Sequence, residues 1–342
     1  MALQATWFFL WGLLWAIFFI TDGFDFGVGT LYPFLGKTET DKRIMINALG
    51  PLWDGNEVWL ITAGGVTFAA FPPVYATMFS TLYSPLMLIL FALILRGVSF
   101  EFRAKAESAF GKRMWDISIF VGSFFPALLF GVAFANIFQG IPFDADRVYQ
   151  GTLLTLLNPY GLLGGLLFLS FFLMHGALWL CIKTENDLQA RAEKAAHTVW
   201  AAFLGLAVLF LIASAFATDL FGNYFQNPIL FLLILLNVLA IVAVKYYMNR
   251  KAFFKAWFAS SLAFICCTFF GIIGLFPNMF PSSLNAAYNL TAFNASSSPL
   301  TLKIMLIVVI LFIPIVLLYQ IWAYTLFKGK VGADDLEYEE AY

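Results

Sequence analysis

Long apolar segments recur along almost the whole chain, and each is long enough to cross a bilayer as a helix. A helix needs about 20 residues to span about 30 Å of hydrocarbon. With 62% hydrophobic and only 11% charged residues, the chain cannot bury its apolar surface as a soluble globule. The sequence therefore predicts an all-α polytopic membrane protein. Its nine expected transmembrane helices are 5–26, 52–71, 74–99, 114–138, 159–182, 195–218, 228–248, 253–276 and 301–326.

Basic residues are distributed unequally among the predicted loops. They are concentrated after the first, third, fifth, seventh and ninth segments, whereas the intervening loops carry only Arg147 and Lys303. Lys and Arg accumulate in cytoplasmic loops, so this pattern predicts an external N-terminus and a cytoplasmic C-terminus. Segments one to four and five to eight then share one orientation, as in a parallel duplication of a four-helix unit. We expect one unit at 1–140, a second at 141–280, and an external loop, ninth helix and acidic tail at 281–342.

The second apolar segment contains two acids, Asp54 and Glu57, with Asn56 between them. From Val58 to Phe71 there are only 14 residues, about 21 Å of helix, so the span has to include both acids. Their spacing of three places them on one face, and an ionisable residue at membrane depth indicates function because its desolvation costs energy. In the alternative interpretation, Asp54 caps the helix and Glu57 completes a capping box.

The first segment ends in another pair of acids, Asp22 and Asp25. With the N-terminus outside, these lie at the same level as Asp54 and Glu57, so four carboxyl groups would face one layer. Four negative charges in such a layer would repel one another, so some have to be protonated or paired with cations. The alternative is a frayed helix end with solvated acids.

One cation and two glycines lie near these acids in the predicted arrangement. Arg96 is placed where the third segment leaves the hydrocarbon. Its side chain can turn inward to a carboxylate or snorkel to the cytoplasmic surface, and snorkelling is the more frequent outcome. Gly23 and Gly27 form a small-xxx-small pair, which predicts the close approach of a neighbouring helix.

Ligands for a metal or heme are scarce in this sequence. His175 and His197 are the only histidines. A bis-histidine heme between segments five and six is one interpretation, but a packed, hydrogen-bonded His175 is the more usual one. The three cysteines, Cys181, Cys266 and Cys267, lie within apolar segments and predict neither a disulfide framework nor a metal site. A net charge of -1 gives no reason to expect nucleic acid as a partner.

Four polar or glycine-rich motifs interrupt the apolar pattern. They are TDGFDFGVG at 21–29, RIMINALGPLWDGNEVWLITAGG at 43–65, SPLMLILFALILRGVSFEFR at 84–103 and GSFFPALLFGVAFANIFQGIP at 122–142. Together with NPYGLLGG at 158–165 and FPNMFPSS at 276–283, they resemble subunit II of the cytochrome bd quinol oxidases. The likeness covers most of the chain, and that family's fold of two four-helix units plus one helix agrees with the nine predicted spans.

The resemblance implies a heterodimer in the bacterial cytoplasmic membrane. Its partner, subunit I, would carry two b-type hemes and one heme d, oxidise quinol and reduce oxygen to water. The resemblance also implies that Asp54, in the WDGN motif, lines a proton route from the cytoplasm, and that Asp25, in the DGFD motif, is a second station. Some relatives have glutamine where this chain has Glu57, which leaves the number of titrating groups open. The resemblance further implies a structural quinone bound against this subunit. A small accessory single-span subunit is a further candidate partner.

Two other functions compete with this interpretation. An ion-coupled secondary transporter would need broken helices and midplane charges in both halves of the chain. A purely structural subunit would only shield the heme subunit, so neutralising the acids would change assembly but not turnover. We expect a proton pathway formed by Asp54, Asp25, Glu57 and Asp22, with Arg96 as a charge partner and no catalytic residue or metal site in this chain.

Overall fold

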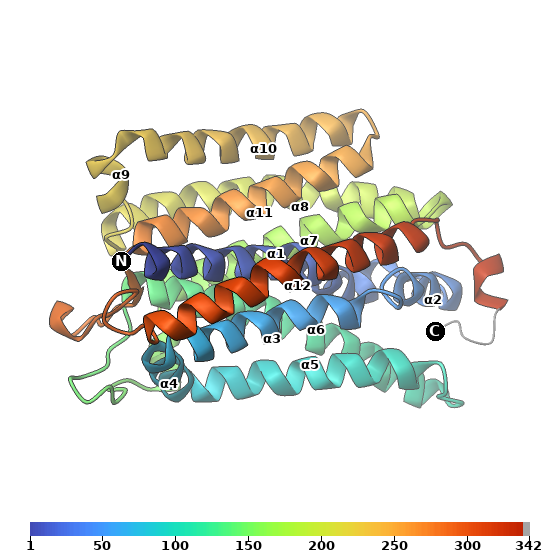
Figure 1. Cartoon of the computed structure of the whole chain (residues 1–342). Coiled ribbons are helices and arrows are strands. Elements are labelled where there is room, and N and C mark those ends of the chain that lie inside the picture. The colour runs from blue at the N-terminus through green and yellow to red at the C-terminus, as the bar shows by residue number, and fades with distance from the viewer. Residues whose placement is uncertain (338–342) are drawn as a thin grey trace.

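The computed structural model, which describes residues 1–337, is a bundle of long helices that run close to one common axis (Figure 1). Within these residues, eight helices are long and apolar enough to cross a membrane, which confirms the predicted all-α polytopic class. They are α1 (Ala2–Leu35), α5 (Tyr83–Arg103), α6 (Ala109–Gln139), α7 (Pro159–Lys183), α8 (Asn186–Ala217), α10 (Phe231–Asn249, extended by a preceding 3-10 turn), α11 (Phe253–Leu275) and α12 (Pro299–Leu326).

The remaining elements are shorter. The helix α3 (Trp53–Ala70) corresponds to the second predicted span, but its acids lower its hydropathy, so composition alone does not identify it as a ninth membrane helix. The others are the α-helices α2 (Glu39–Asn47), α4 (Pro72–Thr81) and α9 (Gly222–Gln226), the 3-10 helices η1 (Leu153–Leu157), η2 (Pro228–Leu230), η3 (Ala286–Tyr288) and η4 (Asp334–Glu337), and the antiparallel strands β1 (Asn278–Phe280) and β2 (Leu290–Thr291).

The third predicted span, 74–99, is not one helix. The short helix α4 covers its first part, the chain leaves helical geometry at Leu82, and α5 begins at Tyr83. Prolines at the first helical positions start α4, and Pro85 fits the first turn of α5, where its missing N–H is not needed. The prediction of a single helix was wrong because it passed over a local signal, the polar residues and the proline at 80–85 that interrupt the apolar segment.

The helix that corresponds to the first predicted span, 5–26, is longer than expected. Helix α1 continues through Pro33 to Leu35, so Asp22 and Asp25 lie inside a continuous helix and are completely buried. The alternative of a frayed end with solvated acids is therefore wrong. Backbone hydrogen bonds are satisfied within the helix, and this allows the polar segment to remain helical next to apolar neighbours.

Helix α1 lies in the middle of the bundle and packs against α3, α6, α7 and α11. Its contact with α7 is especially close, because a Cβ atom on Gly27 would overlap the carbonyl oxygen of Phe172. On the other side of this contact, a Cβ atom on Gly176 would lie 2.5 Å from the backbone nitrogen of Val28. The close helix approach predicted from Gly23 and Gly27 is thus confirmed.

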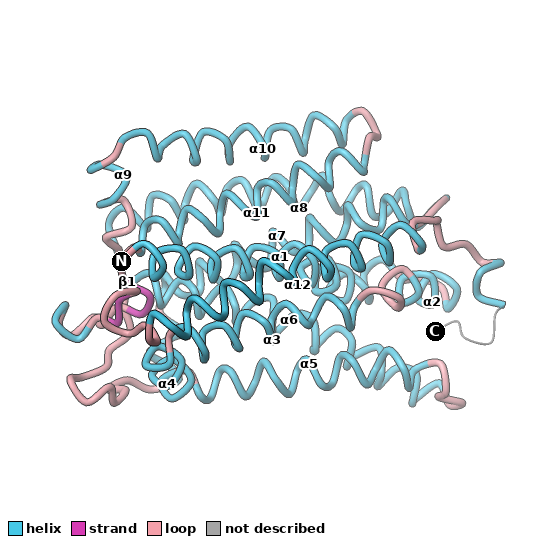
Figure 2. Tube along the Cα trace, viewed as in Figure 1, coloured by secondary structure: helices cyan, strands magenta, loops and turns pink. Residues whose placement is uncertain are grey.

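Different elements lie at the two ends of the bundle (Figure 2). The N-terminus and the small β1–β2 hairpin lie at one end, whereas α2 and the described C-terminal segment lie at the other, here called the α2 end. The C-terminal segment is attached there, because the Val331 N–H donates to the Lys183 carbonyl oxygen at 2.7 Å. Helix α5 packs on α6 at one side of the bundle, and α10 packs on α11 at the opposite side.

Candidate functional site

Arg96 is the centre of a buried charge cluster formed by α1, α3 and α5. Its Nη2 donates to Asp22 Oδ1 at 2.7 Å and to Glu57 Oε1 at 2.5 Å. The side chains of Arg96 and Asp22 are inaccessible to solvent, and that of Glu57 is 22% exposed. The guanidinium carbon also lies 4.4 Å from the ring centroid of Phe26, a distance typical of a cation–π contact. We call these side chains, together with Asp25, the Arg96 cluster.

Arg96 forms ion pairs inside the bundle, so the expected snorkelling of its side chain to the cytoplasmic surface is wrong. Its side chain turns inward because two carboxylates are within hydrogen-bonding distance, and charge-assisted hydrogen bonds gain strength where water is excluded. The pairing is incomplete, since Nε and Nη1 of Arg96 and Oδ2 of Asp22 have no hydrogen-bond partner among the described residues.

Asp25 is held through an amide that joins three helices. Asn56 on α3 donates to Asp25 Oδ2 at 2.8 Å, and the Tyr324 hydroxyl on α12 donates to Asn56 Oδ1 at 2.7 Å. Asp25 Oδ1 is buried without a hydrogen-bond partner in the described part of the chain. Tyr324 was missed in the sequence because a tyrosine near the end of a largely apolar helix gives no signal of an internal contact.

Asp54 does not join the Arg96 cluster. It lies in the exposed first turn of α3, and its carboxylate makes no hydrogen bond or ion pair with residues 1–337. The N-cap of α3 is Leu52 without a side-chain cap, so the capping-box alternative for Asp54 and Glu57 is wrong. A spacing of three separates two side chains by about 60° around a helix, which is enough for Glu57 to face Arg96 while Asp54 faces outward.

A second charge cluster lies at the α2 end. Arg103 donates two hydrogen bonds to the Glu39 carboxylate, both at 2.9 Å, and its Nε donates to Asp116 Oδ1 at 2.5 Å. Asp116 also accepts from Lys42 at 2.6 Å and from the Tyr32 hydroxyl at 2.8 Å. The hydrogen bonds from Arg103 hold the pKa of Glu39 below its ordinary value. We call these five residues the Asp116 cluster.

Sequence reasoning missed the Asp116 cluster because its members come from four separate segments. A signal was nevertheless present. Arg96 and Arg103 are seven residues apart, so they lie on one face of α5, two helical turns from each other. Both are buried, which shows that this face of α5 is polar toward the bundle interior.

The two histidines have different surroundings. His175 is buried, and its ring stacks on Trp257 with centroids 5.0 Å apart. Its Nδ1 is 2.6 Å from the Ser260 hydroxyl and its Nε2 is 3.1 Å from the Ile20 carbonyl oxygen. The interpretation of His175 as a packed, hydrogen-bonded residue is confirmed. His197 is half-buried, and its Nδ1 is 2.8 Å from Lys245 Nζ.

Replacing both histidines with asparagine is expected to leave the heme content of the assembled complex unchanged. Both ring nitrogens of His175 are already engaged by protein groups, so neither is free to bind iron. The measurement is the heme-to-protein ratio from the optical spectrum of the purified complex. Loss of one heme per complex, with the protein still assembled, would show that a histidine of this chain is a ligand.

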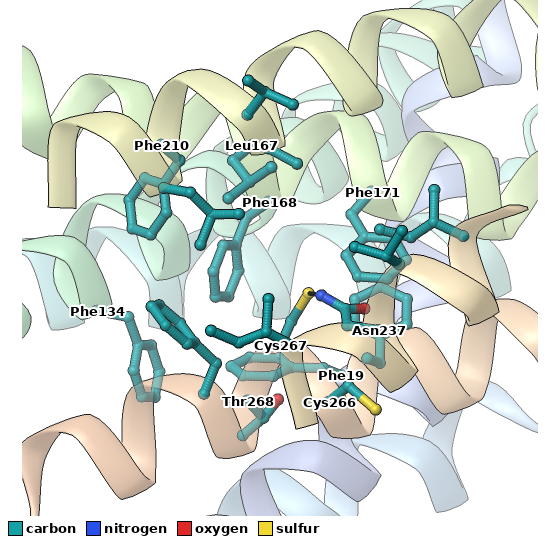
Figure 3. Close-up of a pocket in the computed structure, with 18 of the residues that line it drawn as sticks. Phe19, Phe134, Leu167, Phe168, Phe171, Phe210, Asn237, Cys266, Cys267 and Thr268 are labelled. Atoms are coloured by element: carbon teal, nitrogen blue, oxygen red, sulfur yellow. Dashed lines mark hydrogen bonds between the residues drawn. The ribbon is translucent and has the colours of Figure 1, made fainter. Parts of the chain in front are cut away.

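An apolar cavity of about 120 Å³ is lined mainly by residues of α6, α7, α8, α10 and α11 (Figure 3). Asn237 donates to Cys267 Sγ at 3.2 Å and is the main polar group at its wall. No charged residue of the described chain lines it, so the cavity suits an apolar group. The labelled lining residues are Phe19, Phe134, Leu167, Phe168, Phe171, Phe210, Asn237, Cys266, Cys267 and Thr268.

Comparisons with known proteins agree over nearly the whole chain. Residues 3–327 match the family described as cytochrome bd terminal oxidase subunit II. The chain is 38% identical to cytochrome bd-I ubiquinol oxidase subunit 2 of Escherichia coli, with 98% of this chain and 97% of the relative covered. It is also 38% identical to cytochrome bd ubiquinol oxidase subunit 2 of Bacillus subtilis, covering 97% of each. A chain of the bd oxidase structure from Geobacillus thermodenitrificans shares its fold, with a TM-score of 0.76 at 16% identity over 95% of this chain and 97% of that one.

Proposed function

Because the chain belongs to the cytochrome bd terminal oxidase subunit II family and is therefore a subunit of a membrane-bound quinol oxidase, we propose that its buried acids carry protons toward the site of oxygen reduction. In this proposal α3 is the ninth transmembrane helix, the N-terminus is outside and the α2 end is cytoplasmic. The helices form two parallel four-helix units, residues 1–140 and 141–280, followed by α12.

The composition of the Arg96 cluster is the observation that carries this proposal. Asp22, Asp25 and Glu57 supply three carboxyl groups around a single guanidinium, and Asp22, Asp25 and Arg96 are fully buried. Three ionised carboxylates cannot share one cation in a low-dielectric interior, so the cluster retains at least one exchangeable proton. A dry protein interior conducts protons only through carboxylates, polar side chains and water, and this cluster supplies the first two.

We propose subunit I as the carrier of hemes b and d and of the quinol oxidation site. The family is one of cytochromes, and the ring nitrogens of His175 in this chain are already engaged, which favours heme ligation by the partner. The hemes, when bound there, supply electron transfer and oxygen reduction. A structural quinone and a small single-span accessory subunit complete the proposed complex.

The outward face of α3 is the proposed contact with subunit I. Asp54 is exposed on this face, and a carboxylate directed into acyl chains would have no partner. Gly55, next to Asp54, has no atom of the described chain within 4 Å of where a Cβ would be. A small residue at this position permits a partner helix to approach closely. The partner would thus enclose Asp54 and place it on the proton route.

The competing functions fit the structure less well. A secondary transporter needs charges near the midplane of both halves, but the Arg96 cluster draws all its ionisable groups from α1, α3 and α5. A purely structural subunit has no need of a cluster with three acids for one cation, because burying unpaired charge lowers stability. The transporter and structural alternatives therefore leave the composition of this cluster unexplained.

Asp25→Asn tests the proton role directly. Asparagine keeps the volume and can still accept from Asn56, but it cannot take up and release a proton. We expect oxygen consumption and quinol oxidation to fall together by about tenfold, which corresponds to about 1.4 kcal/mol added to the limiting proton step. Heme content should remain normal. Unchanged turnover in the purified Asp25→Asn complex would support the structural alternative.

A further inference from the structure

Three neighbouring helices each carry two polar side chains seven residues apart. Seven residues are two turns of helix, or about 10.5 Å, so each pair places one polar group at each of two levels on the same helix face. The level nearer the α2 end coincides with the Asp116 cluster, and the level deeper in the bundle coincides with the Arg96 cluster. The pairs are Tyr32 and Asp25 on α1, Arg103 and Arg96 on α5, and Asp116 and Ser123 on α6.

Ser123 lies where α1, α5 and α6 meet. A Cβ atom on Gly29 of α1 would overlap the Ser123 hydroxyl, so only glycine leaves room for it at this contact. Its neighbour Gly122 packs on α5, where an added Cβ would lie 2.7 Å from Arg96 Cβ. The Ser123 hydroxyl therefore projects into the junction of the three helices, next to the Arg96 cluster.

Four polar atoms in and beside this junction lack hydrogen-bond partners in the described part of the chain. The Ser123 hydroxyl is completely buried and has no hydrogen-bond partner among the described residues, and the same holds for Asp25 Oδ1 and for Nε and Nη1 of Arg96. Ser99, between Arg96 and Arg103 on α5, is also completely buried and donates to the Leu95 carbonyl oxygen at 2.5 Å. Its oxygen can accept further hydrogen bonds.

Buried polar groups without protein partners are rare, and ordered water satisfies most of them. We propose that Ser123 and Ser99 hold a short chain of water molecules between the Asp116 cluster and the Arg96 cluster. These water molecules form the cytoplasmic entrance of the proton pathway in this subunit. Two or three molecules at hydrogen-bonding separations of about 2.8 Å would bridge most of the roughly 10.5 Å between the levels.

This inference rests on the proposed proton role and adds a path to it. Protons would enter at Asp116, whose side chain is 13% exposed and accepts from Tyr32, Lys42 and Arg103. They would then move inside the α1–α5–α6 junction to Asp25 and Asp22. Ser123 and Ser99 are positioning residues in this path, because they orient water and do not themselves change protonation state.

The test is a Ser123→Ala, Ser99→Ala double variant of the whole complex. Removing both hydroxyls leaves an apolar gap that holds water poorly. We expect oxygen consumption to fall about fivefold and its solvent deuterium isotope effect to increase, because proton delivery becomes more strongly rate-limiting. The matched control is Ser170→Ala, Ser261→Ala. These two buried serines donate only to their own helix backbones, at Leu167 and Trp257, and should leave both measurements unchanged.

The outcomes separate this inference from the proton role. If Asp25→Asn is slow but the Ser123→Ala, Ser99→Ala complex matches the control, the proton role stands and the water path is wrong. Normal turnover in both would overturn both. If the double variant assembles poorly, Ser123→Ala alone decides, because deleting an unpartnered buried hydroxyl breaks no protein hydrogen bond and is compatible with full stability. Turnover and isotope effect equal to those of Ser170→Ala would then reject the proposal.

Discussion

Arg96→Gln is expected to destabilise the assembled complex by about 3–5 kcal/mol, the usual consequence of removing one partner of a buried ion pair. Glutamine retains a hydrogen-bond donor but no positive charge, so Asp22 and Glu57 would lose their shared cation. At least one of them would have to become protonated or move toward solvent. The measurements are the yield of heme-loaded complex and its midpoint of thermal unfolding.

Two further variants make the Arg96 prediction specific. Arg113→Gln is the matched control, because Arg113 is exposed near the start of α6 and its loss should change stability by no more than about 0.5 kcal/mol. Adding Asp22→Asn and Glu57→Gln to Arg96→Gln should restore much of the stability, since neutral amides can hydrogen-bond without a cation. If Arg96→Gln behaves like Arg113→Gln, the cluster does not depend on its charge balance.

Much of the fold could be predicted because its main constraint is one-dimensional. A transmembrane helix has to be long and apolar, and both properties are visible in a single sequence. The approximate positions of α1, α6 and α7 followed from this. The break between α4 and α5 could not be predicted in the same way, because the polar residues and the proline around Leu82 interrupt the apolar segment too briefly to change its overall length and hydropathy.

The candidate site shows a similar division. The acids at positions 22, 25 and 57 and their cation at 96 could be named from the sequence, since charge within an apolar segment is conspicuous. The direction of each side chain could not. Whether Arg96 turns inward and Asp54 outward depends on how α1, α3 and α5 are rotated about their axes. The hydropathy of a segment does not determine that rotation. The partners Tyr324 and Asp116 required three-dimensional neighbours for the same reason.

The Asp54→Asn, Asp25→Asn double variant should have the largest effect on turnover. The structure places Asp25 in the interior with Asn56, and Asp54 on the outer face of α3, so the two carboxyl groups share no hydrogen-bond partner among the described residues. The effects of residues without shared partners usually add in free energy. If both substitutions raise the barrier of the same limiting proton step, by about 1.4 kcal/mol each, oxygen consumption should fall about a hundredfold.

The single variants show how the two acids are connected. If Asp54 and Asp25 act one after the other, each single variant is slow. If they serve parallel routes, each single variant keeps much of its activity and only the double variant is slow. Asp146→Asn is the control, since this exposed acid lies in the loop between α6 and η1, away from both clusters, and its change should leave turnover unaffected. Heme content has to be equal in all samples, because an assembly defect would also lower activity. Full oxygen consumption by the double variant with intact hemes would contradict the proton role and leave this subunit with a structural one.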